Sequence, residues 1–322
     1  MEKKDKIKRI LITGGAGFIG SHLCERLSNN GHIIYCIDNL VSGNSENISH
    51  LLKKDNFKFY EFDIINDFIE IDDEIDEIYH LASPASPKDY QDRPLETALA
   101  NSLGTLNLLK LAVKKKAKFL FASTSEIYGN PEQHPQSEEY NGAVNPLSER
   151  ACYAESKRFG KTLVSIFRRK HKLDAKIARI FNTYGPRMRY DDGRVIPTFI
   201  WKALHNEDIP IHGNGKQTRS FCYIDDIVEG LIKMMESNHC GPINLGNPNE
   251  EITILSLAQK IKELTKSDSK FVFLPAISDD PIKRKPDISK AKNLLNWEPK
   301  CSLECGLRIT IQYYKKHGGR IK

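Results

Sequence analysis

The chain has 322 residues, of which 39% are hydrophobic and 28% charged, and its formal net charge is +6 at pH 7. These values are typical of a globular protein with a large core, in one big domain or two closely joined ones. No apolar run reaches the ~20 residues of a membrane helix, and the charged start does not resemble a signal peptide. Lysines and arginines are interleaved with acidic residues. We therefore expect neither a membrane nor a nucleic-acid partner.

Seven cysteines are scattered along the chain, and no pair has the spacing of a zinc site. An odd number of cysteines without a regular framework is typical of a reducing compartment. We therefore expect a cytoplasmic protein without a bound metal.

A glycine motif stands near the start of the chain. Residues 7–13 predict a buried strand, and Gly14-Gly-Ala-Gly17-Phe-Ile-Gly20 leads from it into an amphipathic helix over residues 21–30. Gly14 permits a tight turn, Gly17 lets the backbone approach a pyrophosphate, and Gly20 lets helix and strand pack closely. The helix N-terminus then binds the phosphates. The context of strand, turn and helix predicts a dinucleotide site.

The second strand, residues 33–37, ends in Asp38, where a carboxylate hydrogen-bonds the adenosine ribose. No arginine follows directly to accept a 2′-phosphate, so we expect NAD rather than NADP. Asp63, after a strand over residues 57–62, is placed to meet the adenine. The predicted cofactor contacts are Gly14, Gly17, Phe18, Ile19, Gly20, Asp38, Asn39, Asp63, Ile64, Leu81 and Ala82, together with Tyr153 and Lys157.

The candidate chemistry lies in the stretch 123–129 and in Tyr153 and Lys157. The stretch follows an apolar strand, residues 118–122, and so lies where parallel sheets bind ligands. Tyr153 and Lys157 are four residues apart, on one face of a helix. We expect the lysine to lower the pKa of the phenol by favouring the phenolate. Such a phenol can take a proton from a sugar hydroxyl while a hydride leaves the same carbon.

These elements predict an α/β fold, with a Rossmann-type doubly wound parallel sheet and a smaller C-terminal α/β region that binds the substrate. We expect residues 1–186 to form the NAD-binding domain with the catalytic residues, and residues 187–322 the smaller region. Some of its segments should return to the main domain. Two long helices, over residues 94–115 and 153–171, carry apolar residues at helical spacing. Such a helix pair could join a second copy, which predicts a homodimer.

The chain resembles the extended short-chain dehydrogenase/reductase superfamily over nearly its full length. Within it, the UDP-glucuronate decarboxylases, which make UDP-xylose, are the most similar. The segments that carry this resemblance are His80-Leu-Ala-Ser-Pro-Ala-Ser-Pro87, Ser123–Tyr128, His134-Pro-Gln-Ser-Glu138, Val144-Asn-Pro146, Arg150-Ala-Cys-Tyr153, Arg179-Ile-Phe-Asn-Thr-Tyr-Gly-Pro-Arg-Met188, Asp192-Gly-Arg-Val195, Gln217-Thr-Arg-Ser220, Asn244-Leu-Gly-Asn-Pro248 and residues 279–288.

The resemblance implies a chemistry for these residues. NAD takes hydride from C4 of the sugar of UDP-glucuronate while Tyr153, supported by Lys157, removes the hydroxyl proton, and Thr124 holds the same oxygen. The resulting β-keto acid loses its C6 carboxylate, with Ser125 and Glu126 flanking C5 and C6. The ketone is then reduced again, so the cofactor is recycled. The implied substrate contacts are Arg219 and Arg284 on the diphosphate, together with Asn182, Arg187, Arg194 and His212.

Other reactions remain open at this point. The sequence departs from the usual decarboxylase pattern at Asn141, Ser148 and His212, near the expected sugar and base pockets, so the sugar or the base could differ. The alternatives are a sugar-nucleotide 4,6-dehydratase and a 4-epimerase acting on another nucleotide sugar. Many dehydratases have Asp where this chain has Ser125, and epimerases usually have a small apolar residue at Glu126. A regulator without turnover is disfavoured because Thr124, Tyr153 and Lys157 are all present.

Overall fold

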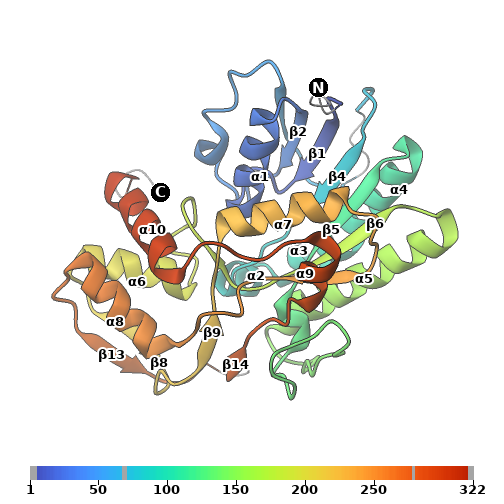
Figure 1. The fold of residues 1–322 in the computed structure, drawn as a ribbon. Helices are drawn as coiled ribbons and strands as arrows, with labels where there is room; N and C mark the ends of the chain where they lie inside the picture. The colour runs from blue at the N-terminus through green and yellow to red at the C-terminus, as the bar shows by residue number, and fades with distance from the viewer. Residues whose placement is uncertain (1–5, 67–70, 278–279, 318–322) are drawn as a thin grey trace.

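The computed structural model describes residues 6–66, 71–277 and 280–317. Within them, seven parallel strands form one sheet in the order β11-β6-β5-β4-β1-β2-β3 (Figure 1). The strands are β1 (Arg9–Thr13), β2 (Ile33–Asp38), β3 (Phe57–Glu61), β4 (Glu77–His80), β5 (Lys118–Thr124), β6 (Ala175–Ile180) and β11 (Pro242–Leu245). The chain winds outward from β1 in one direction and then from β4 in the other, so the predicted doubly wound sheet is confirmed. Asp279, in the last segment of the resemblance, lies outside the described residues.

Helices cover both faces of the sheet, because successive residues of a strand point to opposite sides. Ile10 and Ile12 belong to the core that includes Leu23 of one helix, whereas Leu11 belongs to the core that includes Leu108 of another. The four helices concerned are α1 (Phe18–Asn29) and α7 (Ile224–Glu236) on one face, and α4 (Thr105–Lys115) and α5 (Ala151–His171) on the other. The strands therefore read as continuous apolar runs, as buried parallel strands do.

The helix predicted over residues 94–115 is interrupted. The structure has α3 (Pro94–Leu99), a π-helical turn (Ala100–Gly104) and then α4. Hydroxyl groups explain part of the irregularity, because Ser102 Oγ donates to Ala98 O at 2.6 Å and Thr105 Oγ1 donates to Asn101 O at 2.7 Å. A short helix that the sequence did not predict, α2 (Pro87–Asp92), precedes it.

The second region lies mostly beyond residue 186 and occupies the lower left of Figure 1. Its elements are the helices α6 (Val195–Leu204), α8 (Ile254–Thr265) and α10 (Leu303–His317), the parallel pair β8 (Ile209–His212) and β13 (Phe271–Leu274), and the small sheet of β12 (Glu251–Thr253), β9 (Thr218–Ser220) and β14 (Lys283–Arg284). The helix α7 and the strand β11 return to the main sheet, and α9 (Ser289–Leu295) contacts both. The boundary at residue 186 stays a prediction.

Short elements complete the chain. A small parallel pair joins β7 (Thr183–Tyr184) to β10 (Cys222–Tyr223). Two 3-10 turns follow strands of the main sheet, η1 (Ser45–Ile48) after β2 and η3 (Ser125–Tyr128) directly after β5. In the described part of the chain, every helix is too short or too polar to cross a bilayer.

Candidate active site

A cavity of about 520 Å³ lies at the carboxyl ends of the parallel strands, between the sheet and the second region. Every site residue that the sequence predicts, from the glycine turn to Arg284, lines this cavity. The fold thus brings together residues from both halves of the chain. Their individual roles stay predictions.

The glycine turn is shaped for close approach. Gly14 has a φ of +72°, and a Cβ on it would lie 2.7 Å from the backbone nitrogen of Ala82. A Cβ on Gly20 would lie 2.0 Å from the oxygen of Gly14, so helix and turn could not pack as they do. Among the described residues, no side chain caps the N-terminus of α1, and its first turn has no acidic residue. Its N–H groups therefore suit a phosphate group.

Acidic side chains follow β2 and β3 as the sequence predicts. Asp38 Oδ2 accepts from Ala16 N at 3.0 Å and its Oδ1 from Leu40 N at 2.9 Å. Burial raises the pKa of Asp38, although these N–H groups oppose the rise. Asn39 Nδ2 donates to Asp63 Oδ2 at 3.0 Å, which joins the loops after the two strands. This edge of the cavity, with its carboxylates and its uncapped helix, fits a dinucleotide.

Tyr153 and Lys157 lie on α5 and line the same cavity, near the end of β5. The Tyr153 hydroxyl is hydrogen-bonded to the side chain of Thr124. Lys157 Nζ donates to Ala122 O at 2.8 Å and lies 5.9 Å from the centroid of the Tyr153 ring. The predicted constellation of phenol, hydroxyl and ammonium is therefore assembled in the fold.

The pKa values of this pair differ from the expectation. Burial raises the pKa of Tyr153 to about 12, even though the bond to Thr124 opposes the rise. Burial also lowers the pKa of Lys157 to about 7. The pKa of the phenol is therefore raised and not lowered as expected, because desolvation by burial is the largest effect on it.

Tyr90, which the sequence did not place in the site, lies against Tyr153. The two rings are stacked, with their centroids 5.2 Å apart. The Tyr90 hydroxyl is buried, has no hydrogen-bond partner in the described part of the chain, and belongs to a residue that lines the cavity. In the sequence, Tyr90 stands shortly after the Ser-Pro-Ala-Ser-Pro segment, and this position could have indicated that it belongs to the site.

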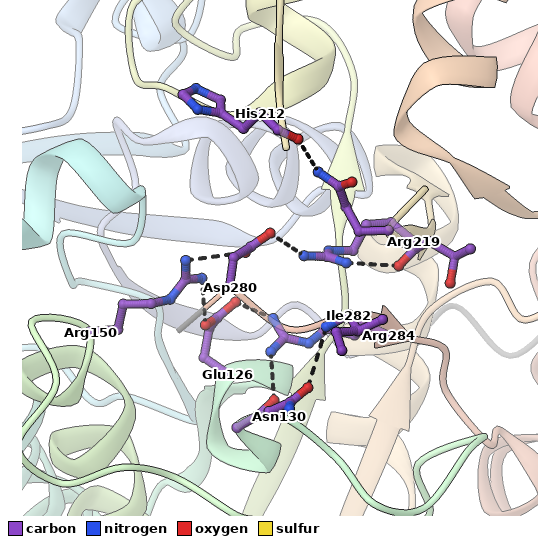
Figure 2. A network of polar contacts seen from close by, with 11 residues as sticks. Glu126, Asn130, Arg150, His212, Arg219, Asp280, Ile282 and Arg284 are labelled. Carbon is purple, nitrogen blue, oxygen red and sulfur yellow. Dashed lines mark hydrogen bonds and ion pairs between the residues drawn. The ribbon is translucent and has the colours of Figure 1, made fainter. Parts of the chain in front are cut away.

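Glu126 is held by two arginines (Figure 2). Arg150 Nη2 donates to Glu126 Oε2 at 2.9 Å, and Arg284 Nη1 donates to Glu126 Oε1. Burial on its own would raise the pKa of Glu126, but the charges of Arg284 and Arg150 lower it to about 2. Glu126 is therefore a carboxylate at neutral pH.

A second carboxylate, Asp280, extends this group of charges. Asp280 Oδ1 lies 3.3 Å from Arg150 Nη1, and its Oδ2 accepts from Arg219 Nη2 at 2.8 Å. Sequence reasoning missed both Arg150 and Asp280 as site residues. Arg150 stands one helical turn before Tyr153, and that spacing could have indicated it.

The other predicted substrate residues occupy three places. Arg187 pairs with Glu25 of α1, and the Arg194 guanidinium lies 5.8 Å from the Phe18 ring of the same helix. Both arginines thus lie beside the predicted dinucleotide. His212 is at the far end of the cavity, where its Nδ1 lies 3.1 Å from Pro275 O. Asn182 stands two residues after the end of β6, on the cavity wall.

This fold and site define a Rossmann-type enzyme that combines a glycine-rich dinucleotide-binding turn with a Tyr-x-x-x-Lys motif. Residues 10–246 match the NAD dependent epimerase/dehydratase family. The chain belongs to that family, which confirms the expected fold class and the expected cofactor, NAD.

Curated relatives and solved structures agree with this assignment. The chain is 49% identical to UDP-glucuronic acid decarboxylase 1 of Danio rerio over 98% of this chain and 74% of that protein. It is 50% identical to UDP-glucuronic acid decarboxylase 1 of Arabidopsis thaliana over 95% of this chain and 70% of that protein. UDP-glucuronic acid 4-epimerase from Bacillus cereus, solved with UDP-glucuronic acid and NAD, superposes with a TM-score of 0.85 at 31% identity over 96% of this chain and 99% of that one.

Proposed function

We propose that this protein is an NAD-dependent decarboxylase that converts UDP-glucuronate to UDP-xylose through a 4-keto sugar. One observation carries the proposal: Arg150 and Arg284 surround Glu126 beside the Thr124–Tyr153 pair. A sugar acid brings a carboxylate to this place, and the guanidinium groups can bind it through donors that Glu126 does not use, such as Arg284 Nε. The near full-length identity to curated UDP-glucuronic acid decarboxylases supports the same reaction.

Tyr153 carries the proton transfer at C4. Its phenol takes the C4 hydroxyl proton, and the Thr124 hydroxyl holds the same oxygen in position. NAD, held at the glycine turn and Asp38, would supply the acceptor for the C4 hydride and a positive charge that favours the phenolate. Lys157 is buried beside the phenol ring, so its ammonium adds positive charge there.

The arginines around Glu126 hold the C6 carboxylate of the 4-keto acid. When the C5–C6 bond breaks, its electrons move toward the C4 ketone and carbon dioxide leaves. Ionised Glu126 fixes Arg284 and Arg150. The hydroxyl of the neighbouring Ser125, which lines the cavity, passes a proton from water to C5 of the enolate that decarboxylation leaves. The Arg284 Nε is buried and, within the described residues, has no partner, so it offers a free donor to a substrate oxygen.

We revise three of the expected substrate roles on the basis of these contacts. Arg284 lies on Glu126, so we assign it to the sugar carboxylate rather than to the diphosphate. Arg187 and Arg194 lie against α1, so we assign them to the cofactor side. Arg219 is left for the diphosphate, with His212 at the base and Asn182 beside the sugar.

We also propose a homodimer formed through α3, the π-helical turn and α5. Apolar side chains are exposed there, with Leu95 at 66% and Phe159 at 51% of full exposure. Ile166 follows Phe159 by two helical turns and is also exposed. Light scattering should find a dimer that Phe159→Glu converts to a monomer. Leu147→Glu, on an exposed residue outside these helices, should leave the dimer intact.

We infer a reducing, cytoplasmic location, since the seven cysteines are all free thiols.

The activity is tested by incubating the purified protein with UDP-glucuronate and NAD⁺ and analysing the nucleotides by mass spectrometry. Loss of carbon dioxide to give UDP-xylose or its 4-keto form is expected. A product of unchanged mass with inverted C4 would show an epimerase instead.

A further inference from the structure

Asp280 lies between two arginines that line the cavity, as Figure 2 shows. Its Oδ2 accepts from Arg219 of β9 at 2.8 Å, and its Oδ1 lies 3.3 Å from Arg150, at the start of α5. One carboxylate therefore bridges the main sheet region and the smaller region across the site.

The charges alternate along a chain of five side chains. Arg284 pairs with Glu126, Glu126 with Arg150, Arg150 with Asp280, and Asp280 with Arg219. Three guanidinium groups and two carboxylates leave a net charge of +1. The Arg219 side chain is only 7% exposed and that of Asp280 is 25% exposed, so water screens this pair weakly.

A phosphate that reaches Arg219 meets this carboxylate. The phosphate and the Asp280 carboxylate compete for the Arg219 guanidinium, and two negative charges beside one guanidinium repel each other. A bound diphosphate can therefore use Arg219 fully only when Asp280 gives up its contact.

We propose that Asp280 is a competing anion built into the binding site, which weakens the grip of Arg219 on the diphosphate. This inference rests on the proposed function, which places the diphosphate at Arg219. Substrate and product carry the same diphosphate, so a site that held it at full strength would release product slowly. Asp280 lowers that affinity through Arg219, whereas its contact with Arg150 lies on the carboxylate side of the site.

The test is isothermal titration of NAD-saturated protein with UDP, dTDP, GDP and uridine. Asp280→Asn removes the competing charge, so the nucleoside diphosphate that the unaltered protein binds should bind roughly three- to tenfold tighter. Uridine carries no phosphate, so its affinity should not change. Asp280→Glu keeps a carboxylate and should bind the diphosphate close to the level of the unaltered protein.

Glu298→Gln is the charge-matched control. It removes one negative charge from an exposed pair with Lys292 and should leave every affinity unchanged. Asp280→Ala should repeat the gain of Asp280→Asn if the latter folds poorly.

Unchanged or weaker diphosphate binding by both variants would overturn the inference, because Asp280 would then support Arg219 rather than compete with it. An equal gain for uridine would also overturn it. Titration needs no turnover. If Asp280→Asn bound UDP more tightly but the unaltered protein released no carbon dioxide from UDP-glucuronate, only the proposed reaction would be refuted. If none of the three diphosphates binds, the inference itself is overturned.

Discussion

The ring of Tyr90 lies parallel to the ring of Tyr153, with centroids 5.2 Å apart and planes 4° apart. This stacking holds the phenol of Tyr153 at one angle toward Thr124. Stacked aromatic pairs contribute about 0.5–1.5 kcal/mol beyond the area that they bury.

Loss of this stacking should therefore reduce turnover. We predict that Tyr90→Leu lowers kcat by roughly two- to tenfold, as the stacking energy implies, because Tyr153 samples unproductive orientations. Tyr90→Phe is the matched variant, since it keeps the ring and loses only the hydroxyl. Steady-state kinetics of both variants would separate the roles, and an equal loss in Tyr90→Phe would show that the hydroxyl matters instead of the stacking.

Removal of the catalytic hydroxyl should leave the cofactor site intact. Tyr153→Phe deletes the group that takes the C4 proton, and we expect kcat to fall by roughly 100-fold or more. NAD should still bind, because the glycine turn and Asp38 are untouched. Turnover and NAD titration measured on the same sample provide the check, and activity near that of the unaltered protein would refute the role of Tyr153.

Changes at the C5–C6 end should stop the reaction after oxidation. Glu126→Gln weakens the hold on Arg150 and Arg284, and we expect the reduced cofactor to accumulate on the protein while carbon dioxide release slows by roughly 10- to 100-fold. Ser125→Ala should act in the same direction. The absorbance of the reduced nicotinamide reports this directly. If no reduced cofactor forms, these two residues act in the oxidation step and our assignment is wrong.

Lys157 should make stability depend on pH. Burial lowers its pKa from 10.5 to about 7, so between these pH values the unfolded chain binds more protons and the folded state gains stability as pH rises. Below about pH 7 the buried charge has its full cost, at about 1.4 kcal/mol for each pKa unit.

Lys157→Met removes that cost. The variant should melt at a higher temperature than the unaltered protein at pH 6, and the difference should shrink as pH rises toward 10.5. The lost bond to Ala122 O offsets about 1 kcal/mol of the gain. Lys110→Met, on an exposed helix position, is the control without this pH dependence. A constant difference across the pH range would contradict the buried ammonium.

The parts of the site that depend on local sequence could be predicted. The glycine turn, Asp38 and the Tyr153–Lys157 pair each lie within one strand, turn or helix, where spacing determines position. The interruption at Ala100–Gly104 was not predicted, because hydrophobic spacing does not distinguish a π-helical turn from a regular helix.

The charged network could not be predicted in the same way. Arg150 and Asp280 are 130 residues apart, and Glu126 and Arg284 are 158 apart, so only the tertiary fold brings them together. In the sequence, Arg284 stands in a run of charges that equally fits a solvated surface. The pKa of Tyr153 was misjudged for a related reason: the neighbouring lysine is visible in the sequence, whereas the burial that outweighs it is not.

The most direct test of the proposed reaction follows the hydrogen at C4. UDP-glucuronate labelled with deuterium at C4 is incubated with the NAD-saturated protein, and the product is analysed by mass spectrometry and NMR. The account predicts UDP-xylose that has lost carbon dioxide and keeps the deuterium at C4, because oxidation, decarboxylation and reduction occur on one bound cofactor. A product that keeps its carboxylate, or UDP-xylose without the label, would contradict it.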